Sequence, residues 1–284
     1  MDLALGTVQF GMLYGVAGGK CLPTDDEVRR ILELAFERGI TMLDTAPAYG
    51  NIEARLGSLC DNLDFKIVSK IPPLPNELDD ISAGQWAVES AQSSRERLGY
   101  RLYALLFHRA EDLLDARGDA VLDALAKWAT AENILIGASG YDVATVRYLF
   151  ERQRISIAQL PGNALDQRIG TVLEKLQPKP ELHLRSAFLQ GLLLLPFDDA
   201  VRLVPAATTA LQQWHHWIRF RGMTALQGAL SIVKAFEDVS ACVVGVDKIA
   251  QLAELLNAWR DVQPIRAADL ASYDSQAIDP RLWR

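Results

Sequence analysis

Short runs of β-type residues alternate along the chain with longer amphipathic segments. This alternation predicts a parallel sheet whose strands are joined by crossover helices. The predicted strands lie at 3–6, 41–44, 65–69, 102–107, 134–138, 156–159, 182–186 and 241–245. Eight such units favour an α/β fold of the TIM type, a (β/α)8 barrel that forms a single domain over residues 1–284.

The amphipathic segments carry apolar residues at the spacing of an α-helix. In segment 24–38 the apolar positions share one helix face, and Asp, Glu and Arg occupy the other. Thr24 followed three residues later by Glu27 is typical of a capping box, in which each residue caps a backbone N–H of the other. Gly39 predicts the end of the same helix.

A doubly wound open sheet is the rival architecture for this alternation. Such sheets normally carry a glycine-rich phosphate loop after the first strand. The segment LGTVQFGMLYG at 5–15 contains glycines but does not match that fingerprint. A barrel therefore fits better, and we expect its chemistry at the carboxyl ends of the strands.

Composition and charge narrow the class of protein. Half of the residues are hydrophobic and 23% are charged, which is ordinary for a globular protein with a large core. A net charge of -7 makes nucleic acid and membrane surfaces poor partners. The three cysteines lie far apart without CxxC spacing, so neither a disulfide framework nor a metal site is predicted. With no secretion signal or membrane span visible, we expect a cytoplasmic protein.

Four polar or ionisable side chains fall at or just beyond the ends of successive strands. The second strand leads to Asp44 and, one short turn later, to Tyr49, while the third and fourth lead to Lys70 and His108. Any one of these alone is better explained as a surface or structural residue. Because strand ends of a barrel converge on one rim, we predict that the four form a catalytic site.

The chemistry of this set is coherent. A phenol is a slow proton donor at neutral pH, and a nearby ammonium such as Lys70 favours the phenolate form of Tyr49. Asp44 is the candidate counter-ion that keeps a partly enclosed ammonium charged. His108 could donate a hydrogen bond to a substrate carbonyl oxygen without being charged itself. Because the set contains no hydride source, a cofactor is required.

On these residues the chain resembles the aldo-keto reductase family, from Gly6 to about Asn257. The family's motifs match here as Asp44-Thr45-Ala46, Tyr49-Gly50, Lys70 and His108, with further similarity at Gly50-Asn51, Glu53, Leu56-Gly57, 136–139, 159–163 and 186–191. The resemblance implies that the tyrosine is the general acid, assisted by the lysine and its aspartate. It also implies that the histidine positions the carbonyl group of the substrate.

The resemblance also implies a nicotinamide cofactor and a set of residues that bind it. Ser139 and Gln159 would bind the nicotinamide carboxamide, and Gln251 and Glu254 would contact the adenosine end. The full predicted cofactor-binding set is Gly6, Thr7, Ser139, Gln159, Arg185, Ser186, Gly191, Gly245, Asp247, Lys248, Gln251 and Glu254.

Several positions depart from the family's pattern. Gly140 stands where an asparagine usually follows the serine of the fifth strand, and Leu255 replaces another frequent asparagine. Arg185 stands where an aromatic residue usually stacks on the nicotinamide. A guanidinium there would be unfavourable beside a positively charged nicotinamide, so Arg185 could instead face the cofactor's diphosphate.

The choice between NADH and NADPH depends on the segment after the eighth strand. Members that use NADPH place a basic residue against its 2′-phosphate, whereas the aligned residue here is Asp247, followed by Lys248. A carboxylate would repel the phosphate and could accept hydrogen bonds from a free ribose hydroxyl. The sequence therefore favours NADH, although Lys248 leaves NADPH open.

The substrate is predicted to be a small carbonyl compound: an aldehyde, a ketone or a sugar. FLQGLLL and GTVQFGMLYGVA resemble a bacterial subgroup associated with polysaccharide biosynthesis genes, which implies a sugar-derived carbonyl. The residues after the first strand, among them Tyr14, could shape the pocket mouth. The short C-terminal segment, with Tyr273 and Trp283, suggests an open pocket.

Two other functions remain open on the sequence alone. Lys70 could attack a carbonyl itself, as in a Schiff-base lyase or aldolase. The chain could also bind a nicotinamide cofactor without turnover, although a binding protein has no need for a tuned phenol. Hydrophobic helix faces leave an oligomer possible.

Overall fold

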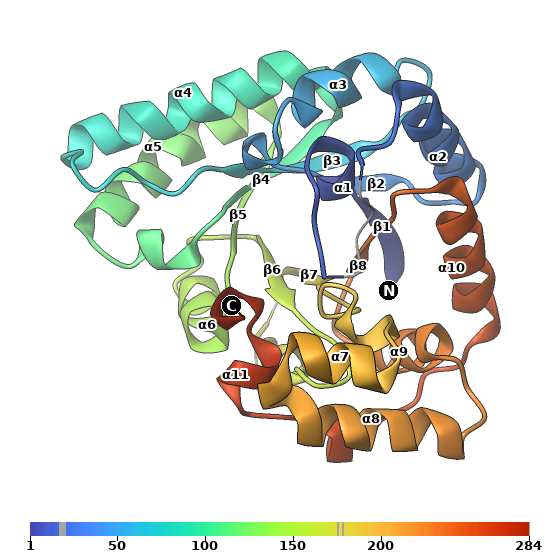
Figure 1. Cartoon of the computed structure of the whole chain (residues 1–284). Helices are drawn as coiled ribbons and strands as arrows, with labels where there is room; N and C mark the ends of the chain where they lie inside the picture. The colour runs from blue at the N-terminus through green and yellow to red at the C-terminus, as the bar shows by residue number, and fades with distance from the viewer. Residues whose placement is uncertain (17–20, 175, 178, 284) are drawn as a thin grey trace.

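Eight parallel strands close into a barrel in the order β1 to β8 (Figure 1). The computed structural model describes residues 1–16, 21–174, 176–177 and 179–283. The strands are β1 (Asp2–Gly6), β2 (Met42–Asp44), β3 (Lys66–Ile71), β4 (Leu102–Phe107), β5 (Leu135–Ser139), β6 (Ile157–Pro161), β7 (Glu181–Arg185) and β8 (Ala241–Gly245). The predicted (β/α)8 barrel is confirmed.

Strand ends differ from the prediction by up to two residues, and two of these differences concern the site. β3 continues through Ile71, so Lys70 lies within the strand and pairs with Leu106 of β4. β7 ends at Arg185 because Ser186, with φ of 61°, leaves the extended region of backbone space.

Helices surround the barrel on its outer side (Figure 1). The α-helices are α1 (Val8–Gly11), α2 (Asp25–Glu37), α3 (Ile52–Leu59), α4 (Asp80–Leu98), α5 (Ala116–Glu132), α6 (Val143–Glu151), α7 (Phe197–Leu203), α8 (Thr208–Phe220), α9 (Ala225–Val233), α10 (Ile249–Asp261) and α11 (Ser275–Ile278). The 3-10 helices are η1 (Pro47–Tyr49), η2 (Gly99–Arg101), η3 (Ala110–Leu113), η4 (Arg168–Thr171), η5 (Leu192–Leu194), η6 (Pro205–Ala207), η7 (Ala268–Leu270) and η8 (Pro280–Leu282).

The start of α2 shows how a local signal is changed by tertiary contacts. The Thr24 side chain accepts a hydrogen bond from the Glu27 N–H, as a capping residue should. The Glu27 carboxylate does not complete the predicted capping box, because it accepts the N–H of Ile249 at the start of α10, 2.8 Å away. Glu27 therefore connects α2 to α10.

The eight units are less regular than the sequence pattern suggested. Among the described residues, the connection between β6 and β7 holds only the 3-10 helix η4 in place of an α-helix. The connection between β7 and β8 instead carries three helices, α7 to α9. These helices and the C-terminal segment lie on one side of the barrel (Figure 1).

The packing follows this division. One large core lies between the strands and the helices α2 to α6 and α10, and includes Val28, Leu43 and Phe107. A second core, centred on Trp214, joins α7, α8 and α9 to α11 and η7. The Trp214 indole donates a hydrogen bond to the Leu193 carbonyl at 3.0 Å, so this buried ring has its polar atom satisfied. No helix in the described part of the chain is both long and apolar enough to cross a membrane.

Candidate functional site

The strands β2 and β3 bring a buried ion pair to the barrel's carboxyl end. The Lys70 Nζ atom lies 2.8 Å from each Asp44 carboxylate oxygen and 3.0 Å from the Thr45 carbonyl oxygen. Both side chains are nearly inaccessible to solvent, at 2% and 8% exposure. The three contacts use all three N–H donors of the ammonium, so its charge is fully compensated.

Tyr49 and His108 lie beside this ion pair. Tyr49 ends the 3-10 helix η1, which follows β2, and its ring centroid is 5.5 Å from the Lys70 Nζ atom. His108 directly follows β4, and its backbone N–H donates to the Ile71 carbonyl at the end of β3. The Tyr49 and His108 rings meet edge-to-face, with centroids 6.2 Å apart. The four predicted catalytic residues are therefore brought together.

The surroundings set the charges of two of these groups. Burial acts to lower the pKa of Lys70, but the Asp44 charge, Tyr49 and the hydrogen bond to Asp44 outweigh it, so the pKa lies above its ordinary value. Burial lowers the pKa of His108 to about 4, and the charges of Lys70 and Arg185 act in the same direction. At neutral pH the lysine is thus charged and the histidine neutral.

A close backbone approach fixes the position of Tyr49. A Cβ atom added to Gly11 in α1 would lie 1.8 Å from the Tyr49 carbonyl oxygen, so only glycine fits there. Gly50, directly after the tyrosine, adopts φ of 76°, which also favours glycine. The turn that presents the phenol therefore depends on two glycines, one of them 38 residues away in sequence.

The buried Glu53 of α3 holds the segment after Tyr49 against β3. Its carboxylate accepts hydrogen bonds from the Ser69 hydroxyl, from Ser94 at 2.9 Å and from Arg97 at 2.7 Å. Ser69 is the neighbour of Lys70 in β3, so this network couples α3 to the strand that carries the lysine. Glu53 is 2% exposed, and its charge is compensated by Arg97.

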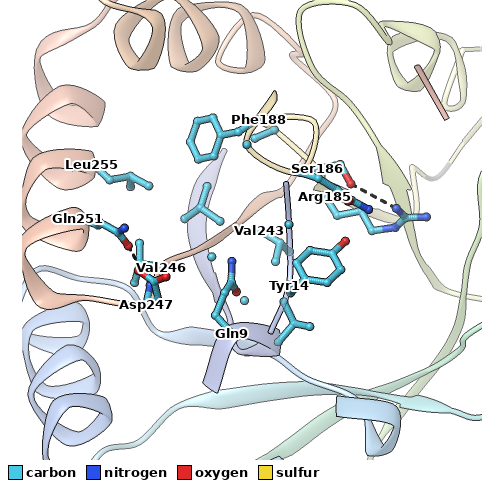
Figure 2. Close-up of a pocket in the computed structure, with 18 of the residues that line it drawn as sticks. Gln9, Tyr14, Arg185, Ser186, Phe188, Val243, Val246, Asp247, Gln251 and Leu255 are labelled. Atoms are coloured by element: carbon cyan, nitrogen blue, oxygen red, sulfur yellow. Dashed lines mark hydrogen bonds between the residues drawn. The ribbon is translucent and has the colours of Figure 1, made fainter. Parts of the chain in front are cut away.

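A cavity of about 270 Å³ opens beside the four predicted catalytic residues, at the carboxyl ends of β1, β7 and β8 (Figure 2). Its walls include Asp44 and Tyr49. Of the residues predicted to bind a cofactor, it contains Gly6, Thr7, Gln159, Arg185, Ser186, Gly191, Gly245, Asp247, Gln251 and Glu254. Most of the predicted set therefore lines one continuous space next to the phenol.

Two residues of the predicted cofactor set lie outside these walls. Ser139 ends β5 as a buried residue paired with Gln159 of β6, and Lys248 is exposed as the residue preceding α10. His108 and Lys70 do not line the cavity either, although Tyr49 and Asp44 do.

Gln159 links the catalytic group to the cavity. Its Nε2 atom donates to Asp44 Oδ2 at 2.7 Å, which joins β6 to β2 across the barrel interior. Its Oε1 atom is buried and has no hydrogen-bond partner among the described residues. A buried acceptor without a partner costs roughly 1–3 kcal/mol, so this oxygen suits an amide or hydroxyl donor of a bound molecule. Gln9 has the same property, and its side chain lies against Gly245.

The loop after β7 has an unusual backbone. Ser186, Leu189 and Gln190 all have positive φ, as does Gly191. Such conformations are costly for residues other than glycine and cluster at functional sites. The Val16 N–H donates to the Gln190 carbonyl, and Asn163 Nδ2 donates to the Ser186 carbonyl, so neighbouring loops hold this shape.

Arg185 extends from the end of β7 toward β5, away from Gln251 and Asp247 (Figure 2). Its guanidinium donates to the Gly140 carbonyl at 2.9 Å and to the Ser186 hydroxyl at 3.4 Å. It also stacks on the Tyr141 ring at 4.2 Å from the centroid. Arg281 of η8 stacks on that same ring at 3.7 Å. We call the region around Arg185 and Tyr141 the mouth of the site. The C-terminal segment, expected to leave the pocket open, thus reaches this mouth.

At the other end of the cavity, Asp247 and Gln251 lie together (Figure 2). The Asp247 N–H donates to Gln251 Oε1 at 2.9 Å, which joins the loop after β8 to α10.

The sequence did not single out Gln9, Tyr141 or Arg281. No local motif marks them, because each gains its place through a contact with a distant part of the chain.

Comparisons with known proteins agree on one family. The Aldo/keto reductase family model matches residues 2–277. A structure from Pseudomonas aeruginosa, provisionally assigned to the aldo-keto reductases, is 25% identical with a TM-score of 0.67, over 91% of this chain and 89% of that one. No curated protein sequence matches the chain.

Two further structures share the fold at lower identity. The holo form of aldo-keto reductase AKR11C1 from Bacillus halodurans is 18% identical, with a TM-score of 0.73 over 97% of this chain and 95% of that one. The glycerol dehydrogenase AKR11B4 from Gluconobacter oxydans is 20% identical, with a TM-score of 0.65 over 94% and 88%.

Proposed function

Because the chain belongs to the aldo/keto reductase family, whose members are oxidoreductases of carbonyls and alcohols, we propose that Tyr49 is its general acid. In this proposal a hydride passes from a nicotinamide cofactor to a small carbonyl compound, and the phenol protonates the resulting alkoxide. The observation that carries it is the Tyr49 phenol held beside a fully compensated Lys70–Asp44 pair, at the wall of a cavity. In the reverse direction Tyr49 is the base.

Lys70 assists by its charge rather than by donating its proton. Its three N–H groups already point at Asp44 and the Thr45 carbonyl, and its pKa is raised. A permanent ammonium next to the phenol stabilises the phenolate that forms when the proton leaves. Asp44 keeps that ammonium charged inside the protein, and Gln159 fixes the carboxylate in turn.

His108 acts in this proposal as a neutral hydrogen-bond donor. With a pKa of about 4 it carries no charge at neutral pH. A neutral imidazole N–H can still polarise a carbonyl oxygen and hold it near the phenol, as an oxyanion-type contact. Its edge-to-face contact with Tyr49 keeps the imidazole beside the phenol.

The cavity beside this group fits a nicotinamide cofactor, which supplies the hydride when bound. The unpartnered Oε1 atom of Gln159 suits the amide N–H of a carboxamide. The loop after β7 lines the same cavity, and its left-handed residues Ser186 and Gln190 give a backbone shape that suits a phosphate. Ser139, at the end of β5, would also bind the carboxamide.

At the far end of the cavity, Asp247 favours NADH over NADPH. A carboxylate repels a 2′-phosphate and accepts hydrogen bonds from ribose hydroxyls. Gln251 and Glu254 of α10 line the same end of the cavity, while Lys248 is exposed beside them.

The structure weighs against the aldolase alternative. A Schiff-base lysine needs a free amine as its nucleophile, with a lowered pKa. Lys70 has the opposite properties, since its pKa is raised and all its donors are used. The sugar-derived substrate implied by the sequence resemblance remains part of the proposal.

The first test is a titration of the purified protein with NADH and NADPH, followed by tryptophan quenching, and then by oxidation of bound NADH with simple aldehydes. We expect micromolar binding of NADH and aldehyde-dependent turnover. Binding without turnover of any carbonyl would leave a nicotinamide-binding protein. Borohydride trapping of an aldehyde on Lys70, without need for a nicotinamide, would replace the proposal by the aldolase.

A further inference from the structure

Arg185 is a cation at the catalytic mouth that the reaction proposed above does not use. It lines the cavity together with Tyr49 and Asp44. Its charge acts on His108, whose pKa it helps to lower after burial and Lys70, and it acts on Tyr14 as well. Its guanidinium therefore lies within electrostatic reach of the groups that would surround a reacting carbonyl.

Most carboxylates at this mouth pair with a cation within the protein. Asp44 pairs with Lys70, Asp279 with Arg281 at 2.6 Å, and Asp166 with Arg168 at 2.8 Å. Asp142 keeps its charge and accepts the N–H and hydroxyl of Thr145 at the start of α6. The formal charges of these groups and of Arg185 therefore cancel. What distinguishes Arg185 is that no carboxylate lies within 4.0 Å of its guanidinium in the described part of the chain.

The hydrogen bonds of Arg185 leave donors free. A guanidinium has five N–H donors, and among the described residues only two of them are directed at protein acceptors, the Gly140 carbonyl and the Ser186 hydroxyl. Stacking on Tyr141 fixes the plane of the group, so the remaining donors are oriented before any ligand arrives. A planar fork of this kind matches a carboxylate, which accepts two parallel N–H bonds.

Arg281 of the C-terminal segment contacts the same ring. It lies on the Tyr141 ring as Arg185 does, but its own charge is compensated by Asp279. Tyr141 therefore contacts two cations, and of the two only Arg185 has no carboxylate within 4.0 Å in the described part of the chain.

We propose that this protein acts on carbonyl compounds that also carry a carboxylate, and that Arg185 binds this carboxylate while Tyr49 protonates the carbonyl oxygen. The substrate class is then an aldehyde acid or keto acid, including acidic sugar derivatives. This inference rests on the proposed reductase function, and it concerns only which carbonyl compounds the same site prefers.

The test compares two aldehydes of equal size, 4-formylbenzoate and 4-formylbenzamide, together with their 3-formyl isomers. Two quantities are measured for wild type and for Arg185→Gln: the Kd of each compound by calorimetry, and kcat/KM with NADH. Of the two acid isomers, one should have the higher kcat/KM with the wild type. We expect this acid to be preferred over the amide of the same geometry by about 10- to 100-fold, the range of a charged hydrogen-bonded contact. Arg185→Gln should remove most of that preference in both Kd and kcat/KM.

Arg281→Gln is the matched control, because it removes one positive charge from the same tyrosine ring. Its charge is already compensated by Asp279, so we expect the acid-to-amide ratio to change by less than about threefold. An equal loss of the ratio in both variants would show that the general field of the mouth, rather than Arg185, selects the acid, and would overturn the assignment.

The outcomes separate this inference from the reductase function. Turnover of both aldehydes at equal kcat/KM overturns the inference and leaves the reductase function intact. Selective binding of the acid that depends on Arg185, without turnover, supports the inference and overturns the reductase function. If Arg185→Gln weakens NADH binding tenfold or more and affects both aldehydes equally, Arg185 is a cofactor residue and the inference is wrong.

Discussion

The rim of the barrel has two halves that differ in whether their cations are paired with a carboxylate. The half from β2 to β4 carries Asp44, Tyr49, Lys70 and His108, with a buried ion pair whose donors are all used. The half from β5 to β8 carries a half-buried Arg185 without a carboxylate partner in the described chain, and a loop of left-handed residues.

This contrast suggests a division of roles, in which the first half carries the proposed reaction and the second half selects the cofactor and the substrate. The first half also matches the family's motifs, whereas the departures at Gly140, Arg185, Asp247 and Leu255 all lie in the second half. A buried pair resists substitution because removing one partner leaves an uncompensated charge. Half-exposed positions at the rim can change at little cost in stability, so the choice of cofactor and substrate can vary there.

The sharpest difference between the halves should come from Tyr49→Phe. The variant lacks the proton donor and keeps the ring, so we expect kcat to fall by at least about 10²–10⁴, the usual contribution of a general acid. NADH affinity should stay within about threefold, because the phenol lies at the edge of the cofactor cavity. Stopped-flow turnover and fluorescence titration measure the two, and unchanged turnover would remove Tyr49 from the mechanism.

Removing a cation should cost far more stability in the first half than in the second. Lys70→Met leaves Asp44 charged and buried, and we expect a loss of about 3–5 kcal/mol in the free energy of unfolding. Arg185→Met, at the half-exposed mouth, should cost about 1 kcal/mol or less. Urea unfolding gives both values, and the double variant Asp44→Asn with Lys70→Met should recover part of the loss. Equal losses in the two single variants would contradict the contrast.

Gly11→Ala tests whether the first half depends on a fixed backbone. The added methyl group would lie 1.8 Å from the Tyr49 carbonyl oxygen, so the turn that carries the phenol must move. A displacement of about 1 Å can reduce turnover on the order of 10²-fold. Gly170→Ala is the control, because its new atom would meet Phe236 at an ordinary 3.5 Å. Wild-type kcat in Gly11→Ala would show that the close approach is not functional.

In the second half, Asp247→Arg should change the cofactor preference. A guanidinium in place of the carboxylate adds a favourable phosphate contact, and we expect the NADPH-to-NADH affinity ratio to rise about tenfold or more. Fluorescence titration with both cofactors measures it, and Lys248→Ala measures separately what the neighbouring lysine contributes to NADPH binding. If the ratio stays at the wild-type value, the 2′ position of the cofactor is bound elsewhere.

The smallest expected effect concerns the pH dependence of His108. Because its folded pKa is about 4 and an unfolded histidine titrates near 6.5, the unfolded chain takes up this proton first. The stability that the neutral imidazole contributes is therefore present above about pH 6.5 and is lost as pH falls toward 4. His108→Gln should flatten this part of the stability profile, which urea unfolding at pH 4 to 7 measures. An NMR titration midpoint near 6.5 for His108 would contradict the low pKa.

The placement of the four residues in the half from β2 to β4 could be predicted from the sequence. These residues come directly after strands, and the barrel brings consecutive strand ends together, so order along the chain becomes order around the rim. Even there Glu27 was predicted wrongly as half of a capping box, because its carboxylate binds Ile249 of α10. Glu53 was visible as a motif residue, but its role in joining α3 to β3 and α4 was not.

Two further features of the mouth could not be derived from local pattern. In the described part of the chain, the single 3-10 helix after β6 and the three α-helices after β7 break the regular alternation that the hydrophobic pattern suggested. The C-terminal segment reaches Tyr141 through Arg281, although its shortness suggested an open pocket. Both depend on how distant segments pack against one barrel face.

The sequence by itself determined the (β/α)8 barrel and indicated that Asp44, Tyr49, Lys70 and His108 come together at one rim, because hydrophobic periodicity and the order of strands can be read along the chain. The tertiary structure decided which charges are compensated. Lys70 and Arg185 are both cations at strand ends in the sequence, yet packing buries the first against Asp44 and leaves the second with free donors at the mouth. Electrostatic energy depends on distance and burial, and these exist only once the chain is folded.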